Sequence, residues 1–146
     1  MSEKLKVCFV CTGNTCRSIM AERIFKDLIK KAKVTNIIVC SKGVAAHAEN
    51  ITENAKLVLK ENKLNSKDRK SIKLKKIEQG ILYVAMTEKI KGMISGKVIS
   101  IKDLIGKEIL DPYGLSLEVY RETFNELKLA LEVLLNKITK VRGVKW

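Results

Sequence analysis

The sequence predicts an α/β domain in which helices cover both faces of a parallel sheet. Two observations favour this fold class. Short apolar runs alternate along the chain with segments of helical periodicity, as expected for successive βαβ units. The 146 residues contain no internal repeat and no linker rich in proline, glycine or serine. We therefore expect one domain over residues 1–146, long enough to bury a substantial core.

Four segments are predicted as strands because each is short, apolar and rich in branched residues: 5–10, 37–41, 81–86 and 98–101. Four helical patterns are predicted between or beside them: 18–33, 52–62, 71–79 and 87–95. The clearest helix comes last and follows Ser116, a predicted N-cap. Its apolar stripe, spaced by three and four residues over roughly six turns, comprises Leu117, Tyr120, Phe124, Leu127, Leu131, Leu134 and Ile138.

Composition and cysteine content narrow the function classes. Hydrophobic residues make up 46% of the chain and charged residues 31%, as in a globular domain, and no apolar run is long enough to span a bilayer. The sequence Met1-Ser2-Glu3-Lys4 has no signal-peptide pattern. We therefore expect a cytoplasmic protein with no membrane partner. Four cysteines in such a chain favour reduced, catalytic or metal-binding thiols over a disulfide framework.

The formal net charge is +13, from 29 basic and 16 acidic side chains. This excess is compatible with nucleic acid, an anionic surface or phosphorylated substrates as partners. Because the lysines are spread along the chain and form no block, we interpret the charge as a solvated surface. Nucleic acid is therefore not the expected partner.

The stretch with the clearest chemistry runs from Cys11 to Ser18, between the first predicted strand and the first predicted helix. A turn that leads into a helix points several backbone N–H groups inward, and the helix N-terminus adds partial positive charge. Arg17 supplies a planar fork of donors that matches phosphate oxygens. The same field favours Cys11 as the thiolate, which is the nucleophilic form. We therefore predict inorganic phosphate or a similar oxyanion in this loop.

An acid on the opposite side of the anion would complete a catalytic site. The carboxyl ends of parallel strands meet at one edge of a sheet, and the predicted loop 102–115 returns to that edge with Asp111 and Pro112. Attack by Cys11 on phosphorus requires a proton for the leaving atom, and Asp111 is predicted to supply it. Asp111 would then activate the water that hydrolyses the cysteinyl-phosphate. No metal or other cofactor is predicted, because Arg17 and the loop neutralise the transferring group.

The remaining loop residues are predicted to bind the substrate or shape the loop. Gly13 would allow close backbone approach and unusual dihedrals, while Asn14 tolerates left-handed geometry and can brace the loop. Ser18 can donate a hydrogen bond to the Cys11 thiolate, and Cys16 could form a reversible disulfide with Cys11. The predicted substrate-binding residues are Thr12, Gly13, Asn14, Thr15, Cys16, Ser18 and, as a pocket wall, Tyr113.

The pattern Cys11-x5-Arg17-Ser18, with Asp111-Pro112-Tyr113 late in the chain, resembles the low-molecular-weight protein tyrosine phosphatase family over essentially the whole sequence. The resemblance implies a nucleophile at Cys11, a phosphate-binding Arg17 and a general acid at Asp111. It also implies a four-stranded parallel sheet of order 2-1-3-4. The segment Ser41-Lys42-Gly43 is similar to the family's Ser-x-Gly segment, whose serine helps to brace the loop.

Within this family, Thr15 is similar to the bacterial protein-arginine phosphatases, whereas tyrosine-specific members commonly carry a bulky aliphatic residue there. Threonine is smaller and offers a hydroxyl to a polar phosphoguanidinium group. The 43–50 loop has no aromatic residue to stack on a phenyl ring, and Gly114 stands where tyrosine-specific relatives often have a second tyrosine. We therefore favour phosphoarginine in proteins as the substrate, with phosphotyrosine as the alternative.

Two departures from the family pattern concern how the loop is held. Ile19 stands where the family usually has proline, which weakens preorganisation of the helix start but removes no catalytic group. Arg69 stands where many members have a histidine that braces the loop asparagine. The sequence therefore leaves open how Asn14 is held.

Three further hypotheses compete with a phosphatase. A thiol-dependent arsenate reductase would need additional cysteines, yet none follows Cys40. A non-catalytic module that binds phosphorylated or nucleic-acid partners would leave the nucleophile, arginine and acid idle. A redox or zinc role for Cys8 is not favoured, because Cys8 lies inside a predicted strand and paired ligand spacing is missing. Cys8 and Cys40 are instead predicted to be buried core thiols.

Overall fold

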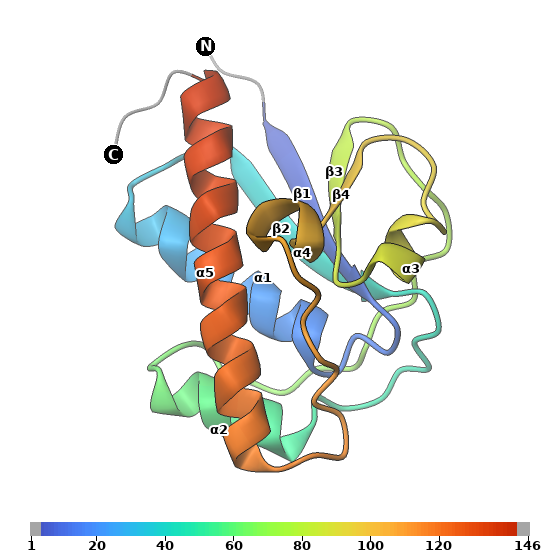
Figure 1. The fold of residues 1–146 in the computed structure, drawn as a ribbon, viewed down its shortest axis with the longest axis vertical. Helices are drawn as coiled ribbons and strands as arrows, with labels where there is room; N and C mark the ends of the chain where they lie inside the picture. Colours follow the sequence, from blue (N-terminus) through green and yellow to red (C-terminus); the bar gives the residue numbers. More distant parts are fainter. Residues whose placement is uncertain (1–3, 143–146) are drawn as a thin grey trace.

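Four parallel strands form the sheet at the centre of the molecule (Figure 1). They are β1 (Leu5–Cys11), β2 (Ile37–Gly43), β3 (Ile81–Ala85) and β4 (Val98–Ser100), in the order β2-β1-β3-β4. The computed structural model describes residues 4–142; the first three residues, on which the signal-peptide expectation mostly rests, lie outside this range. All four predicted strands are confirmed, and the strand order is the one that the family resemblance implied.

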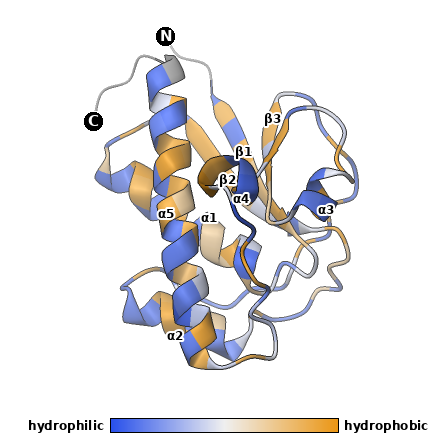
Figure 2. Ribbon diagram, viewed as in Figure 1, coloured by the Kyte–Doolittle hydropathy of each residue, from blue (hydrophilic) through white to orange (hydrophobic). Residues whose placement is uncertain are grey.

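The helices are α1 (Arg17–Lys31), α2 (Glu53–Glu61), α3 (Glu88–Lys91), α4 (Ile101–Ile105) and α5 (Leu117–Arg142). Helix α5 runs along most of the molecule and packs against α1, α2 and α4 (Figure 1). Its apolar stripe faces the core as predicted, and Figure 2 shows hydrophilic and hydrophobic residues alternating along the α5 ribbon. Ser116 accepts a hydrogen bond from Val119 N at 3.4 Å, as expected of an N-cap. Within residues 4–142, no helix combines the length and the apolar character needed to cross a membrane.

The two faces of the sheet are covered differently. Phe9 of β1 meets Phe25 of α1 with ring centroids 5.6 Å apart, so β1 side chains in register with Phe9 face α1. Because side chains alternate along a strand, Cys8 faces the opposite side. Tyr83, which pairs with Cys8, lies on that side as well, and its hydroxyl accepts a hydrogen bond from Glu78 N at 2.9 Å. The chain at Glu78 therefore lies over the face opposite α1.

The helix predicted over residues 71–79 was wrong, because this segment is irregular and makes only an isolated bridge, from Lys73 to Gly43. Gly43 N donates to Ile72 O at 2.9 Å, and Leu74 N donates to Gly43 O at 2.9 Å. The segment thus lies beside the free edge of β2, where its backbone groups hydrogen-bond to that strand. These bonds replace those of a short helix, which would be only marginally stable on its own. Leu74 and Ile77 pack against the core.

Three smaller expectations also needed correction. The helix predicted over 87–95 is the single turn α3, which ends at Gly92. The predicted loop 102–115 begins inside α4, whose capping box joins Ser100 and Asp103. Cys40 is half-buried and not a core thiol, because β2 is an edge strand; Cys8 is fully buried, as predicted.

Candidate active site

The loop between β1 and α1 lines a cleft of about 280 Å³ at the carboxyl edge of the sheet. Most of the residues singled out from the sequence meet there, including Asp111, which is a hundred positions from Cys11 in the chain. Ser18 does not line the cleft but lies buried beneath it. The lining consists of residues 11–17 together with Ala45, Glu49, Asp111 and Tyr113.

Cys11 ends the central strand β1 and lies on the floor of the cleft, with 3% of the residue exposed. Its Sγ is 2.8 Å from Ser18 Oγ and accepts a hydrogen bond from Asn14 N at 3.1 Å. The first hydrogen bond of α1 runs from Met20 N to Cys16 O. The backbone N–H groups just before Met20 therefore have no partner within the helix and add positive potential beside the sulfur. Hydrogen-bonding groups and positive potential thus surround the sulfur.

Arg17 connects the loop to the segment that follows α4. Its guanidinium is buried; Nη1 donates to Ile109 O at 3.2 Å, and Nη2 lies 3.5 Å from Asp111 Oδ2. Asp111, unlike Arg17, is exposed: 52% of its side chain is accessible. Its Oδ1 accepts a hydrogen bond from Tyr113 N at 3.1 Å, which fixes the turn. The cleft thus has a sulfur on its floor, a guanidinium in its wall and a carboxyl group at its mouth.

Asn14 is the residue that holds the loop in shape. It adopts a left-handed backbone conformation with φ 57°, which asparagine tolerates better than most residues. Its Nδ2 donates to Ser18 Oγ at 2.7 Å and to Ser41 Oγ at 3.0 Å. Its Oδ1 accepts hydrogen bonds from Arg69 Nη1 at 3.1 Å and Ile72 N at 3.0 Å. All four hydrogen-bonding positions of the amide are therefore occupied.

The sequence left open how Asn14 is held, because Arg69 stands where a bracing histidine was expected. These contacts answer that question: Arg69 itself hydrogen-bonds to Asn14. Its other nitrogen, Nη2, donates to Ser41 Oγ at 2.7 Å and lies 3.3 Å from Glu22 Oε1. Ser41 Oγ in turn donates to Glu22 Oε1 at 2.7 Å. Glu22 projects from α1 and is 6% exposed, so Arg69 also neutralises a buried carboxylate.

Glu22 was missed by the sequence reasoning. It lies among buried apolar neighbours on α1, and a carboxylate in such a position requires a cationic or hydrogen-bonding partner. That conflict was visible in the sequence and could have signalled a buried network. The partner residue, Arg69, could not have been assigned from spacing alone, since it lies in an irregular segment far from α1.

Close packing against the loop requires a glycine at Gly43, at the end of β2, and not at Gly13. The expectation of unusual dihedrals at Gly13 was wrong: its φ is not positive, and an added Cβ would meet only Thr15 Oγ1, at 3.5 Å. At Gly43, an added Cβ would lie 2.6 Å from Thr12 O and 2.9 Å from Asn14 N. Gly43 therefore lets the end of β2 press against the loop.

Thr15 and Cys16 form the side of the cleft nearest α2 and α5. Thr15 is 7% exposed, and its carbonyl accepts a hydrogen bond from Thr52 N at 3.1 Å. Cys16 Sγ lies 3.6 Å from the Tyr120 hydroxyl and 3.8 Å from Thr52 Oγ1. Burial raises the pKa of the Cys16 thiol, so this sulfur is held protonated. The disulfide between Cys11 and Cys16 stays a prediction.

The outer rim carries one aromatic side chain and one unexpected carboxylate. Tyr113 is 62% exposed and lines the cleft, as predicted for a pocket wall. Glu49, which the sequence reasoning did not select, also lines it. The backbone of Glu49 is fixed by Ser71: Glu49 N donates to Ser71 Oγ at 2.9 Å, and Ser71 N donates to Glu49 O at 2.7 Å. His47 is exposed and does not line the cleft.

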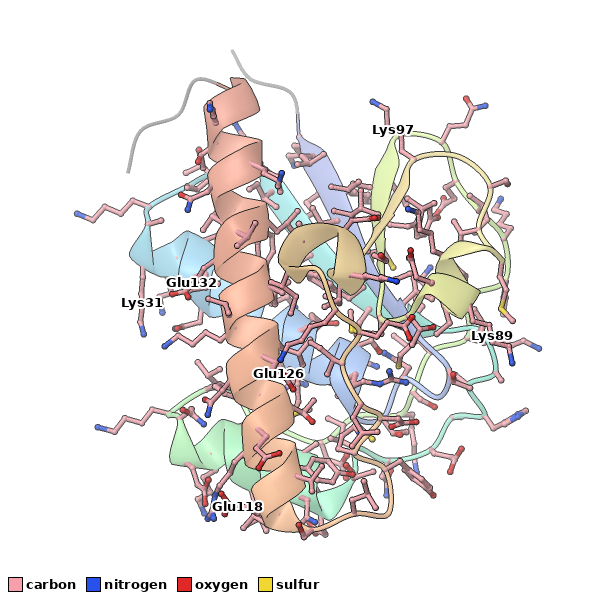
Figure 3. The ribbon with its side chains drawn as sticks, viewed as in Figure 1. Lys31, Lys89, Lys97, Glu118, Glu126 and Glu132 are labelled. Carbon is pink, nitrogen blue, oxygen red and sulfur yellow. The ribbon has the colours of Figure 1, made fainter. Side chains whose placement is uncertain are left out.

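Two further features concern the partners considered from the sequence. Among residues 4–142, no group of three or more histidine, cysteine or acidic side chains is arranged to hold a metal ion. In Figure 3, Lys31, Lys89 and Lys97 project from well-separated parts of the outline, as expected of lysines that are spread along the chain.

Comparisons with known proteins point to one family. The family model described as low molecular weight phosphotyrosine protein phosphatase matches residues 6–143. A Geobacillus stearothermophilus protein named protein-arginine-phosphatase is 34% identical over 145 residues, covering 91% of this chain and 95% of that protein. A Staphylococcus haemolyticus protein named low molecular weight protein-tyrosine-phosphatase PtpB is 27% identical, covering 84% and 92%.

Solved structures agree with this assignment. The chain superposes with a TM-score of 0.86 on the YwlE arginine phosphatase, in a cysteine-to-serine mutant with a phosphorylated active-site serine. Sequence identity is 32%, and the match covers 97% of this chain and 100% of that one. In that protein, the residue at the mutated position therefore carries the phosphoryl group.

Proposed function

Because the chain belongs to the low molecular weight phosphotyrosine protein phosphatase family, we propose that its cleft dephosphorylates protein side chains through Cys11, with phosphoarginine as the preferred substrate. The observation that carries this proposal is the arrangement of the cleft, with a buried sulfur on the floor and an accessible carboxyl group at the mouth. Family membership makes the chain a protein phosphatase; the roles of individual residues and the substrate are our assignments.

In the first step, the Cys11 thiolate attacks phosphorus while the bond from phosphorus to the leaving nitrogen or oxygen breaks. The three nonbridging oxygens accept hydrogen bonds from the loop N–H groups and from Arg17. Asp111, in its protonated form, transfers its proton to the leaving atom. The products are the dephosphorylated side chain and a cysteinyl-phosphate. Arg17 reorients little for this task, since its guanidinium already borders the cleft beside Asp111.

In the second step, Asp111 is ionised and accepts a proton from water as the water oxygen attacks phosphorus. The sulfur–phosphorus bond breaks, and inorganic phosphate leaves the loop while Cys11 returns to the thiolate. Ser18 Oγ, 2.8 Å from the sulfur, stabilises the thiolate as leaving group by hydrogen bonding. Phosphate is therefore both a product and the oxyanion that we expect to bind in this loop.

Two wall residues support phosphoarginine as the substrate. Thr15 presents a small polar side chain where a bulkier aliphatic one would fill the space beside the phosphoryl group. Glu49 places a second acidic residue beside Asp111 at the cleft, and the planar phosphoguanidinium offers N–H donors that match its carboxylate. The relative that is named protein-arginine-phosphatase is also more similar to this chain than the one that is named PtpB.

Phosphotyrosine is the second candidate, and Tyr113 is the observation that favours it. This ring is exposed on the rim of the cleft and could stack on a phenyl group. The remaining competitors fit less well. An arsenate reductase lacks relay cysteines after Cys40, and a non-catalytic binding module would not need Cys11 and Asp111 in one cleft.

A direct comparison of two peptides tests the substrate. We expect the native protein to hydrolyse a phosphoarginine peptide with a higher kcat/KM than a phosphotyrosine peptide of otherwise identical sequence. Thr15→Ile should lower this ratio, because the larger side chain crowds a guanidinium but packs against a phenyl ring. Glu49→Gln should lower kcat/KM for phosphoarginine by up to about fivefold and leave phosphotyrosine unchanged.

The control for these variants is His47→Ala, an exposed change in the same loop that does not border the cleft. It should alter neither substrate's turnover. A native preference for phosphotyrosine, or a ratio that Thr15→Ile leaves unchanged, would overturn the substrate assignment without affecting the phosphatase assignment.

The cytoplasm remains our proposed location for the enzyme. All four cysteines lie within the described part of the chain and all are free thiols. Free thiols, one of them nucleophilic, are maintained in a reducing compartment.

A further inference from the structure

A second pair of cysteines lies on the sheet, away from the cleft. Cys8 of β1 and Cys40 of β2 are direct partners in the parallel register. Neighbouring strands are about 4.7–4.9 Å apart, which is within the Cα separation of about 4.4–6.8 Å that disulfides span. Residues in direct register also point to the same face of the sheet. For this pair it is the face opposite α1, since Cys8 alternates with Phe9.

The two sulfurs differ in access and in chemistry. Cys8 is 1% exposed, whereas Cys40 is half-buried on the edge strand β2. A hydrogen bond from the Cys8 thiol, followed by the nearby charge of Lys42, lowers the pKa of Cys40 to about 7. The same hydrogen bond raises the pKa of Cys8, which therefore stays protonated. Lys6 flanks the pair on the same face, two residues before Cys8.

This arrangement has the two parts of a thiol oxidation site: a partly accessible thiol on an edge strand and a buried thiol directly beside it in the strand register. We propose that Cys8 and Cys40 form a peroxide-sensitive disulfide, with Cys40 as the attacking sulfur and Cys8 as the resolving one. The site is separate from the cleft, because neither cysteine lines it and both lie on the far face of the sheet.

The chemistry is balanced with a peroxide as the only oxidant. The Cys40 thiolate attacks one peroxide oxygen, the O–O bond breaks, and the displaced oxygen takes up a proton, leaving Cys40 as a sulfenic acid. The Cys8 thiol then loses its proton and attacks the Cys40 sulfur. The S–S bond forms as the S–O bond breaks, and the oxygen leaves as water. A dithiol reductant reverses the bond.

The position of Cys40 places this bond next to the active-site support. Ser41, the following residue, points to the other face, where its hydroxyl holds Asn14 and Glu22. The disulfide would join the strand that carries Ser41 to the strand that carries Cys11. It does not consume the nucleophile, unlike a bond between Cys11 and Cys16.

The test uses the full chain with Cys11→Ser and Cys16→Ser, which leaves Cys8 and Cys40 as the only thiols. We expect hydrogen peroxide to remove both thiols from alkylation, with loss of two hydrogens in the intact mass. Peptide mapping without reductant should yield one Cys8–Cys40 linked peptide, and dithiothreitol should restore both thiols. The same linked peptide should appear in the native protein after peroxide treatment.

A matched variant that also carries Cys8→Ser separates the two roles. In this variant Cys40 should accumulate as a sulfenic acid that dimedone captures, because no resolving thiol remains. Circular dichroism shows that each variant is folded. Free Cys40 after peroxide, a disulfide between two chains, or sulfinic acid at Cys40 while Cys8 is present would overturn the proposal.

Discussion

Asp111 is set apart from the other groups of the cleft by its exposure. Cys11 and Arg17 are buried and held by several contacts, whereas about half of the Asp111 side chain is accessible. A group that releases a proton in one step and accepts one from water in the next needs access to both substrate and solvent. Its ion pair with Arg17 keeps it beside the phosphate site without burying it.

We expect Asp111→Asn to lower kcat by about 10²–10⁴-fold, the range for loss of a general acid or base. Folding should be unaffected, since the side chain is half exposed. Asp27→Asn, which alters a carboxylate at the far end of α1, serves as the control and should leave kcat unchanged. A kcat for Asp111→Asn close to the native value would show that another group handles the proton.

At the scale of elements, one polar network joins α1, β2 and the segment after α2 to the catalytic loop. Glu22 comes from α1, Ser41 from β2, and Arg69 from the irregular segment. Their hydrogen bonds converge on Asn14, the residue with the left-handed backbone. The loop's shape is therefore fixed by side chains that do not line the cleft.

We expect Arg69→Ala to lower the free energy of unfolding by about 2–3 kcal/mol, at or below the lower end of the range for breaking a buried pair, because Arg69 is partly accessible. The same change should lower kcat for the phosphoarginine and phosphotyrosine peptides by a similar factor. It loosens Asn14 but leaves Thr15 and Glu49, the residues proposed to select the substrate, in place. Urea unfolding and steady-state kinetics measure the two effects.

Lys26→Ala is the matched control, because Lys26 also pairs with Glu22 but from an exposed position. It should cost at most about 0.5 kcal/mol and leave kcat unchanged. Equal effects of the two substitutions would contradict a specific bracing role for Arg69.

The strands and most helices could be predicted because the spacing of their apolar residues follows which side chains are buried. The loop from Cys11 to Ser18 could be predicted as a loop because its residue types are typical of anion-binding turns. Failures occurred where tertiary partners override local preference. Residues 71–79 leave the helical conformation because the edge of β2 and Asn14 take up their hydrogen bonds. The α4 helix was missed although its capping box, Ser100 with Asp103, is a local signal. The bracing by Arg69 depends on a contact that spans 55 positions, which spacing cannot reveal.

For the whole molecule, carboxylates with a lowered pKa make the stability of the fold sensitive to acid. Hydrogen bonds from Arg121 lower the pKa of Glu61, one from Ile51 N lowers that of Asp68, and one from Lys91 lowers that of Asp103. A carboxyl group whose pKa is lower in the folded state stabilises that state above its unfolded pKa. This contribution is lost as the pH falls through the folded pKa.

We therefore expect the free energy of unfolding to fall once the pH drops below the unfolded pKa values of these groups, 4.5 for glutamate and 3.8 for aspartate. Protonation also leaves the positive charges unopposed, so added salt should recover part of the loss. Urea unfolding followed by circular dichroism measures the profile. Arg121→Gln should flatten it by removing the shift at Glu61, and stability that rises on acidification would contradict this account.

The architecture explains why residues that are distant in the sequence line one cleft. A parallel sheet brings the ends of β1 and β4 to the same edge, so Cys11 and the segment after α4 converge whatever their separation in the chain. The rim could not be foreseen in the same way. Glu49 lines the cleft from a backbone that is hydrogen-bonded to Ser71, and that contact joins two irregular segments.

The central claim is that Cys11 accepts the phosphoryl group. The most direct measurement is rapid acid quenching during turnover of a phosphopeptide, followed by mass spectrometry of the peptide that contains Cys11. We predict a phosphoryl group on Cys11 in the native protein and in Cys16→Ser, and none in Cys11→Ala, which should also lack turnover. A phosphoryl group on any other residue, or turnover that persists in Cys11→Ala, would contradict the account.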